Sequence, residues 1–343
     1  MAGTWYPASP GALTREVDGY VAAVGPTEVI PRGRLDAIIA PHAGLMFSGP
    51  VGAYAYKAAA DGGPFDTVIL AGPSHFVAFD GVALYPSGAF ESPLGPAPID
   101  EQLGQELMAA SLVVQPMPAA HAREHSLEMQ LPFIRRLLPD AAIVPLLMGY
   151  QTRETIRGLA DALARVSAGP ASPKPQGEGG PNPHGGSGLA PPKPGEGGRR
   201  ILLVASTDLS HYFDARTAEA LDARVEACVA SCDPERLLQI FEEYPEGERG
   251  RFVACGGGPA IAVMLAARAR GAQHGRVLKY MHSGQISGDN SGVVGYLAGA
   301  LGTFSERASA SEPRERSGDH GVPASERVGG YGGAKPPVKN DVH

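Results

Sequence analysis

Short apolar runs alternate with longer segments of helical periodicity along most of the chain. The apolar runs predict strands over Asp36–Ala40, Thr67–Ala71, Gly81–Tyr85, Ala142–Met148, Arg200–Ala205 and Val293–Ala298. The helical periodicity predicts helices over Gly11–Val24, Gly49–Ala60, Glu101–Ala110, Leu127–Leu138, Thr152–Ser167, Ala215–Ser231, Pro234–Glu243 and Pro259–Arg270. The first, second and fifth strands are almost continuously apolar, as strands are when helices cover both faces of a sheet. This alternation predicts an α/β fold with a central, largely parallel or mixed sheet.

Glycine and proline are concentrated in two polar segments. The chain contains 46 Gly and 32 Pro, and they accumulate in residues 168–199 and again beyond Phe304. Such segments cannot bury enough apolar surface to offset the entropy that ordering removes. We therefore expect a disordered insert at 168–199 and a disordered tail at 305–343. The remainder, roughly 270 residues, is near the upper size for one core, so residues 1–304 are predicted to form a single α/β domain.

The overall charge and the apolar runs exclude several classes of partner. The chain has 343 residues and a formal net charge of −7, and no run of Lys or Arg in the folded part supplies the positive surface that nucleic acid requires. The longest apolar stretches, Ala141–Met148 and Pro259–Ala267, are far shorter than a membrane span. Residues Met1–Pro10 lack the basic head and apolar run of a secretory signal. We expect a cytoplasmic protein that binds neither nucleic acid nor membrane.

Polar side chains follow three of the apolar strands at the point where each strand ends. The loops after these strands are rich in Gly, Pro and Ser, and they carry His42, His75, and the pair Asp208 and His211. In open α/β sheets, ligands bind beyond the carboxyl ends of the strands. We therefore expect these four side chains to share one rim of the sheet. For any one histidine alone, a hydrogen bond that stabilises its loop is the open alternative.

Cys255 extends this pattern. Phe252-Val253-Ala254 leads into it, three glycines follow, and Pro259 is expected to open the next helix. A thiol just before a helix N-terminus is favoured as thiolate by the helix dipole. Two imidazoles and a thiolate, from His42, His75 and Cys255, suit Zn, Cu or Fe and do not suit Mg or Ca. A phosphate-binding turn, which would lack the lysine of a P-loop, and a buried structural thiol are the alternatives.

The other two cysteines, Cys228 and Cys232, stand at helical i, i+4 spacing in an alanine-rich segment. Three cysteines in all are an odd number, and in a reducing compartment they are expected to be thiols. We predict that Cys228 and Cys232 are small buried apolar side chains.

Residues His121–His125 spell H-x-x-E-H, the inverted zinc-peptidase motif. That chemistry needs both histidines on one helical face. Two prolines precede the segment, however, and Ser126 is predicted to cap the helix that follows. Both histidines are therefore expected in a loop, which disfavours a peptidase. His125 and Glu128 are predicted to support the pocket as acid–base groups, with helix capping as the alternative for both.

Several segments, in order along residues 2–301, together resemble one protein family. They are AGTWYP at residues 2–7, APHAG around His42, GPSH ending at His75, EHSLEMQLPF from Glu124, STDLSH ending at His211, CGGGP from Cys255, and GVVGYLAGAL ending at Leu301. The family is Memo, whose bacterial members are called AmmeMemoRadiSam system protein B. It is similar in fold to the β-type subunits of class III extradiol ring-cleaving dioxygenases. The resemblance therefore implies a three-layer α/β/α fold.

The resemblance also implies roles for the candidate residues. It places His42, His75 and Cys255 in a metal-type pocket, with Asp208 beside them and His211 in the place of the dioxygenases' acid–base histidine. Because Cys255 stands where those enzymes use a carboxylate to hold ferrous iron, ring cleavage is not implied. Family links to iron or copper binding and to redox control imply Fe or Cu ahead of Zn.

Two functions follow as expectations. The first is a metal-binding, redox-related protein, acting as a metal-dependent oxidoreductase if it turns over a substrate. The second is a non-catalytic module whose vestigial active-site crevice binds a peptide or protein, because the carboxylate ligand of the dioxygenases is lost and small loop residues keep the rim open. The resemblance also links animal members to phosphopeptide binding. The family name implies radical-SAM and AMMECR-type proteins as partners. A site without metal, in which Cys255 is structural, is the remaining alternative.

Overall fold

The structure, a computed structural model, describes residues 1–25, 33–167 and 198–304. These residues fall within one compact unit, Met1–Glu306. Apart from Gly198 and Arg199, the predicted disordered insert and the predicted disordered tail lie outside the described residues, so both stay predictions.

A mixed sheet forms the centre of the fold. Its strands are β1 (Gly33–Ala40), β2 (Thr67–Pro73), β3 (Val82–Leu84), β6 (Val114–Pro116), β7 (Ala142–Met148), β8 (Ile201–Ser206), β9 (His211–Phe213), β10 (His274–His282) and β11 (Val293–Phe304). They are ordered β10-β11-β1-β8-β2-β7-β3-β6, with β9 paired to β11. The four strands β1, β8, β2 and β7 pair in parallel, whereas β11 joins β1 and β3 joins β7 in antiparallel fashion. The prediction of a largely parallel or mixed sheet is confirmed. A separate two-stranded pair is formed by β4 (Ala89–Phe90) and β5 (Ala97–Pro98).

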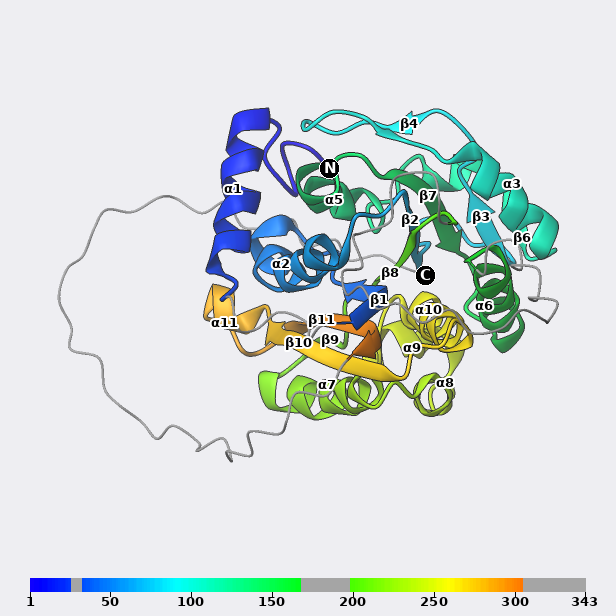
Figure 1. Ribbon diagram of the computed structural model, residues 1–343. Helices are drawn as coiled ribbons and strands as arrows, with labels where there is room; N and C mark the ends of the chain where they lie inside the picture. The colour runs from blue at the N-terminus through cyan, green and yellow to red at the C-terminus, as the bar shows by residue number, and fades with distance from the viewer. Residues whose placement is uncertain (26–32, 168–197, 305–343) are drawn as a thin grey trace, which may run out of the picture. The chain divides into compact units, whose positions relative to one another are not determined.

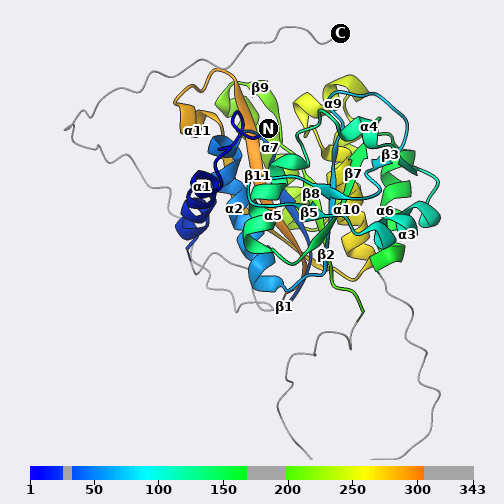
Figure 2. The ribbon, with the colours of Figure 1, turned by 90° about the horizontal axis from the view of Figure 1, so that it is seen from above.

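Helices cover both faces of this sheet (Figures 1 and 2). On one face lie α1 (Pro10–Ala23), α2 (Leu45–Gly62) and α5 (Leu131–Leu137). On the other lie α3 (Glu101–Ala110), α6 (Arg153–Ser167), α7 (Ala215–Ala230), α8 (Pro234–Glu242) and α10 (Gly257–Ala269). Neighbouring residues of β1 enter opposite cores: Ile38 packs with the first group and Ile39 with the second. Burial on both faces explains the continuously apolar strands, and the predicted three-layer α/β/α fold is confirmed.

The predicted helix Leu127–Leu138 is divided into a short 3₁₀ turn, η1 (Glu128–Gln130), and α5. Pro132 lies in the first turn of α5, where its missing N–H costs no helical hydrogen bond, so the regular helix begins around it. The prediction that Ser126 caps this helix is wrong, because Leu127 and Gln130 are the N-cap residues of η1 and α5; the Ser126 hydroxyl instead donates to the carbonyl of Pro73 (3.0 Å). Helix α10 likewise begins at Gly257, two residues before the predicted opening at Pro259.

The remaining short helices are α4 (Pro118–His121), α9 (Glu246–Phe252) and α11 (Gly284–Ser287). His121 is therefore the last residue of a helix, and its prediction as a loop residue is wrong. His125 lies outside that helix, so the two histidines do not share a helical face as a zinc peptidase would require.

The described ranges contain no single helix that is both long and apolar enough to cross a membrane. Helices α9 and α10 meet such a test only as a pair bent by 79°, and most of α10 is buried against the sheet.

Candidate metal centre

Three adjacent parallel strands place the predicted site residues at one edge of the sheet. Strand β8 lies between β1 and β2 and pairs with both in parallel, so the carboxyl ends of all three point the same way. His42, His75 and Asp208 each stand two residues beyond one of these strands. The short, equal offset brings side chains from three distant parts of the sequence to one place. This is the strand-end geometry by which open α/β sheets bind ligands.

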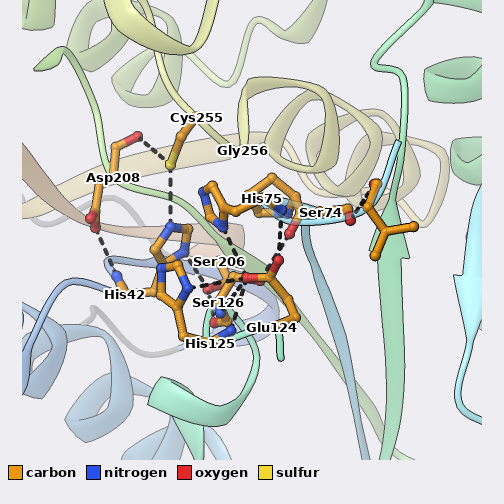
Figure 3. Close-up of polar contacts among 12 residues, drawn as sticks. His42, Ser74, His75, Glu124, His125, Ser126, Ser206, Asp208, Cys255 and Gly256 are labelled. Carbon is orange, nitrogen blue, oxygen red and sulfur yellow. Dashed lines mark hydrogen bonds and ion pairs between the residues drawn. The ribbon is translucent and has the colours of Figure 1, made fainter. Parts of the chain in front are cut away.

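Cys255 meets His42 at this edge (Figure 3). Its Sγ lies 3.2 Å from Nε2 of His42 and 3.7 Å from the carbonyl oxygen of Asp208. The Asp208 carboxylate in turn accepts the backbone N–H of His42 (2.7 Å). The thiol is fixed from the helix side as well, because the N–H of Gly256 donates to Thr207 Oγ1 (2.9 Å) and that of Gly258 to Gln151 Oε1 (2.7 Å).

His75 is held by Glu124. One carboxylate oxygen lies 2.9 Å from Nδ1 of His75, and the other accepts the backbone N–H of His75 (2.6 Å). Glu124 Oε1 also accepts the backbone N–H groups of His125 and Ser126 (2.9 Å each). When a carboxylate accepts a hydrogen bond from Nδ1 of a histidine, Nε2 is the ring nitrogen left free to bind a metal.

His125 joins the two predicted ligands. One ligand nitrogen each from His42, His75 and His125 lie within 4.8 Å of one another, a spacing that could hold a metal ion. The ring of His125 stacks on His75, with centroids 4.6 Å apart, and meets His42 edge-on at 5.6 Å. Its buried Nδ1 lies 3.4 Å from Glu124 Oε1 without forming a hydrogen bond to a described group. The sequence predicts His125 as an acid–base group; the geometry places it equally well as a ligand.

Burial and neighbouring charge separate the protonation states of these groups. Burial, aided by the nearby imidazoles, lowers the pKa of His42 well below its usual range. Burial likewise lowers the pKa of His125 to about 4. Burial alone would lower the pKa of His75, but hydrogen bonding and charge from Cys255 and Glu124 raise it to about 10. The same ion pair, with backbone N–H donors, lowers the pKa of Glu124 to about 2 against the effect of burial. In the metal-free chain at neutral pH, His75 is the charged histidine of the three.

The predicted helper residues surround this cluster. Burial raises the pKa of Asp208 to about 7, which suits a group that exchanges a proton near neutral pH. His211 has Nδ1 2.7 Å from the carbonyl of Leu209, and burial lowers its pKa to about 4. His211 is also among the neighbouring histidines that lower the pKa of His42. Glu128 Oε1 accepts hydrogen bonds from the hydroxyl of Tyr6 and the amino group of Met1, each at 2.7 Å.

A cavity of about 230 Å³ is lined by Glu124 and Glu128 together with Tyr85, Phe90 and His121. On the solvent side, two exposed aromatic residues contact the ring of His125. Trp5 is 37% exposed with its centroid 4.4 Å from that of His125, and Phe76 is 51% exposed at 6.0 Å. His42 is buried, whereas His75 is exposed and His125 lies against these two exposed aromatic rings.

Three residues that hold the centre together are absent from the sequence-based prediction of the site. Glu124 orients His75, and Ser206 and Gln130 form a buried hydrogen-bond network beneath His42. Signals for two of them exist in the sequence. Glu124 directly precedes His125, and Ser206 stands at the end of the strand that leads to Asp208.

The fold and these contacts define the class: an α/β/α protein with a cluster of histidines and one cysteine, at the carboxyl ends of its central strands, that could hold a transition metal. The sequence model of the "Memo-like protein" family matches residues 1–172 and 195–300. The chain therefore belongs to the Memo family.

Curated relatives agree with this assignment over nearly their whole length. A MEMO1 family protein of Methanopyrus kandleri is 32% identical over 304 residues, which cover 87% of this chain and 96% of the relative. One from Methanothermobacter thermautotrophicus is 32% identical over 300 residues, covering 86% and 96%. Among solved structures, an uncharacterized protein from Escherichia coli K12 matches with a TM-score of 0.48 at 14% identity, covering 78% of this chain and 100% of that one.

Proposed function

We propose that this Memo-family chain binds a redox-active transition metal, iron or copper ahead of zinc, between His42, His75 and Cys255. The observation that carries the proposal is the convergence of ligand atoms: the thiol is 3.2 Å from His42 Nε2, and nitrogens of His42 and His75 belong to a cluster within 4.8 Å. Imidazole and thiolate together favour Fe, Cu or Zn over Mg or Ca.

The residues present fit such an ion. Glu124 on His75 Nδ1 is the kind of outer carboxylate that orients metal-binding histidines. A ring nitrogen of His125 within 4.8 Å of those of His42 and His75 would supply an additional ligand atom. A bound metal would supply electron transfer or Lewis-acid chemistry. The chain's own contribution is proton handling by Asp208 and His211, at the positions that the family resemblance assigns to such groups.

Anaerobic metal analysis with spectroscopy of the purified protein tests this proposal. Wild type should contain iron or copper, and Cys255→Ala should lose most of it and lose any thiolate-to-metal absorption. Cys228→Ala is the matched control, because it removes a buried thiol on α7 that takes no part in the centre. Equal metal content in wild type and Cys255→Ala would show that Cys255 is not a ligand. If His125→Ala loses the metal while Cys255→Ala keeps it, the ligand set is His42, His75 and His125.

A second candidate function is a binding module for a protein or peptide, with radical-SAM and AMMECR-type proteins as proposed partners. The exposed rings of Trp5 and Phe76 against His125 favour it, because exposed aromatic residues are typical of interaction sites. Calorimetry with a purified AMMECR-type protein, with and without a chelator, separates the two candidates. Binding that survives chelation and is lost in His42→Ala or His211→Ala supports the module. Metal-dependent turnover of a small oxidisable substrate supports the first proposal.

A further inference from the structure

A buried polar network beneath His42 determines which of its ring nitrogens faces the centre. Nδ1 of His42 lies 2.9 Å from the hydroxyl oxygen of Ser206, and both residues are buried. A hydroxyl can either donate to this nitrogen or accept from it. The direction of that hydrogen bond fixes the tautomer of the neutral ring.

The side-chain amide of Gln130 has one orientation in this network. Its Nε2 lies 3.0 Å from the carbonyl oxygen of Pro41, which can only accept, so Nε2 is the donor. The hydroxyl of Tyr56 donates to Oε1 on the other side (2.9 Å). Nε2 also lies 2.8 Å from Ser206 Oγ, so the amide donates its second hydrogen to that hydroxyl.

The hydrogen of the Ser206 hydroxyl has a separate acceptor. Ser206 Oγ lies 2.6 Å from the backbone carbonyl of Ser126, which can only accept. The hydroxyl therefore donates to Ser126 and accepts from Gln130. The Ser206 oxygen therefore has only a lone pair to offer His42. The hydrogen in the 2.9 Å contact must come from Nδ1 of His42.

We infer that Ser206 is a positioning residue that fixes neutral His42 as the Nδ1–H tautomer and so presents the Nε2 lone pair to the centre beside Cys255. The low pKa of His42, caused first by burial, is consistent with a neutral ring. The assignment itself stands on four contacts between 2.6 and 3.0 Å. The effect of this tautomer on metal binding rests on the proposed function. The tautomer assignment does not rest on it.

The tautomer matters because only an unprotonated nitrogen can bind a metal. In the opposite tautomer, an N–H would point from His42 Nε2 toward Cys255 Sγ, 3.2 Å away. The thiolate would then accept a hydrogen bond from the residue that should share its metal. Loss of an outer-sphere partner of a metal-binding histidine typically lowers metal affinity about 10- to 100-fold.

The experiment uses full-length protein labelled with ¹⁵N at histidine, reduced and free of metal, at neutral pH. Long-range ¹H–¹⁵N correlation spectra distinguish the two tautomers, and the spectrum of His42→Gln identifies the His42 signals among those of the 10 histidines. Wild type should show an Nδ1–H ring at His42. Ser206→Ala should lose that pattern and become a mixture or the Nε2–H form.

Ser210→Ala is the matched control. Ser210 follows the same strand, is fully buried, and has a hydroxyl that makes no hydrogen bond to a described histidine. It should keep the wild-type pattern at His42. In titrations with Co²⁺ alone, Ser206→Ala should bind about 10- to 100-fold more weakly than wild type, and Ser210→Ala should bind as wild type does.

An Nε2–H ring in wild type overturns the inference whether or not Ser206→Ala folds. An unchanged Nδ1–H pattern in folded Ser206→Ala, or equal Co²⁺ affinity of that variant and wild type, overturns the role of Ser206. If wild type does not bind Co²⁺, the proposed function fails, and the tautomer spectra still decide the inference by themselves.

Discussion

Nε2 of His42 lies 3.2 Å from Sγ of Cys255, although 213 positions separate the two residues in the chain. His42 follows a central strand, and Cys255 precedes the helix that packs over that part of the sheet. The pair is therefore produced by the docking of α10 on β1 and β8. Chemistry at this pair is sensitive to anything that shifts this helix relative to those strands.

The ion pair of Glu124 with His75 should make the protein acid-sensitive. The pKa of Glu124 is about 2 in the folded chain against an ordinary value of 4.5. Its contribution to stability is therefore present above pH 4.5 and is lost as the pH falls toward 2. Glu124→Gln should lower the free energy of unfolding by about 3 kcal/mol at pH 6. It should also weaken the pH dependence of that free energy below pH 4.5. Denaturant unfolding across this pH range measures both effects. As a control, Gln substitution of the exposed Glu154 should leave the loss of stability below pH 4.5 unchanged. The same loss of stability below pH 4.5 in Glu124→Gln as in wild type would contradict the prediction.

The sequence predicts those parts of the centre that follow from strand ends. His42, His75 and Asp208 can be grouped without knowing the strand order, because parallel strands present their carboxyl ends at one edge. The prediction that Cys255 joins these residues follows from its position just before a helix. These positions are properties of single segments, and single segments can be recognised in the sequence.

Other parts of the centre depend on distances between segments, which periodicity does not encode. His125 follows no strand, and it reaches the cluster because Glu124 binds its backbone together with that of His75. The network of Ser206 and Gln130 joins a strand end to a 3₁₀ turn. Strand β10 is missed for a different reason: most of its residues are half-buried at the edge of the sheet, which leaves no clear apolar pattern.

Metal binding should release a proton from His75. Its pKa of about 10 in the metal-free chain means that its ring is protonated at pH 7.5, and a ligand nitrogen must lose that proton. Zn²⁺ affinity should therefore rise about tenfold per pH unit between pH 7 and 9. Calorimetry in two buffers with different ionisation enthalpies should show release of at least one proton. His211→Gln is the control, because His211, with a pKa of about 4, is already unprotonated. An affinity that is flat over this range would argue against His75 as a ligand.

Asp208 should destabilise the metal-free fold as the pH rises. Burial raises its pKa from 3.8 to about 7, so between these values the folded chain keeps a proton that the unfolded chain has lost. Stability from this group therefore falls from pH 4 to pH 7 and changes no further above that. Asp208→Asn does not titrate and can still accept the N–H of His42, so it should gain on wild type by on the order of 3 kcal/mol across this interval. Unfolding in the presence of a chelator at pH 4.5 and 7.5 measures the gain. An equal change in the free energy of unfolding of wild type and Asp208→Asn between the two pH values would contradict the prediction. As a control, Asn substitution of the exposed Asp161 should give the wild-type change.

Gly256 should control the distance between Cys255 and His42. A Cβ at this position would come within 2.5 Å of the carbonyl oxygen of Ser206 and 2.9 Å of Thr207 Cβ, which are not at the flexible end of a side chain. Gly256→Ala must therefore push the start of α10 away from β8, at a cost of about 1–3 kcal/mol in unfolding free energy. The thiol should move out of reach of His42, which will change its rate of alkylation by iodoacetamide. Gly247→Ala in α9 is the matched control, because its Cβ would meet no described atom within 4 Å; it should be neutral or stabilise the helix by up to about 1 kcal/mol. Equal stability and equal alkylation rates in both variants would show that the start of α10 can relax without moving Cys255.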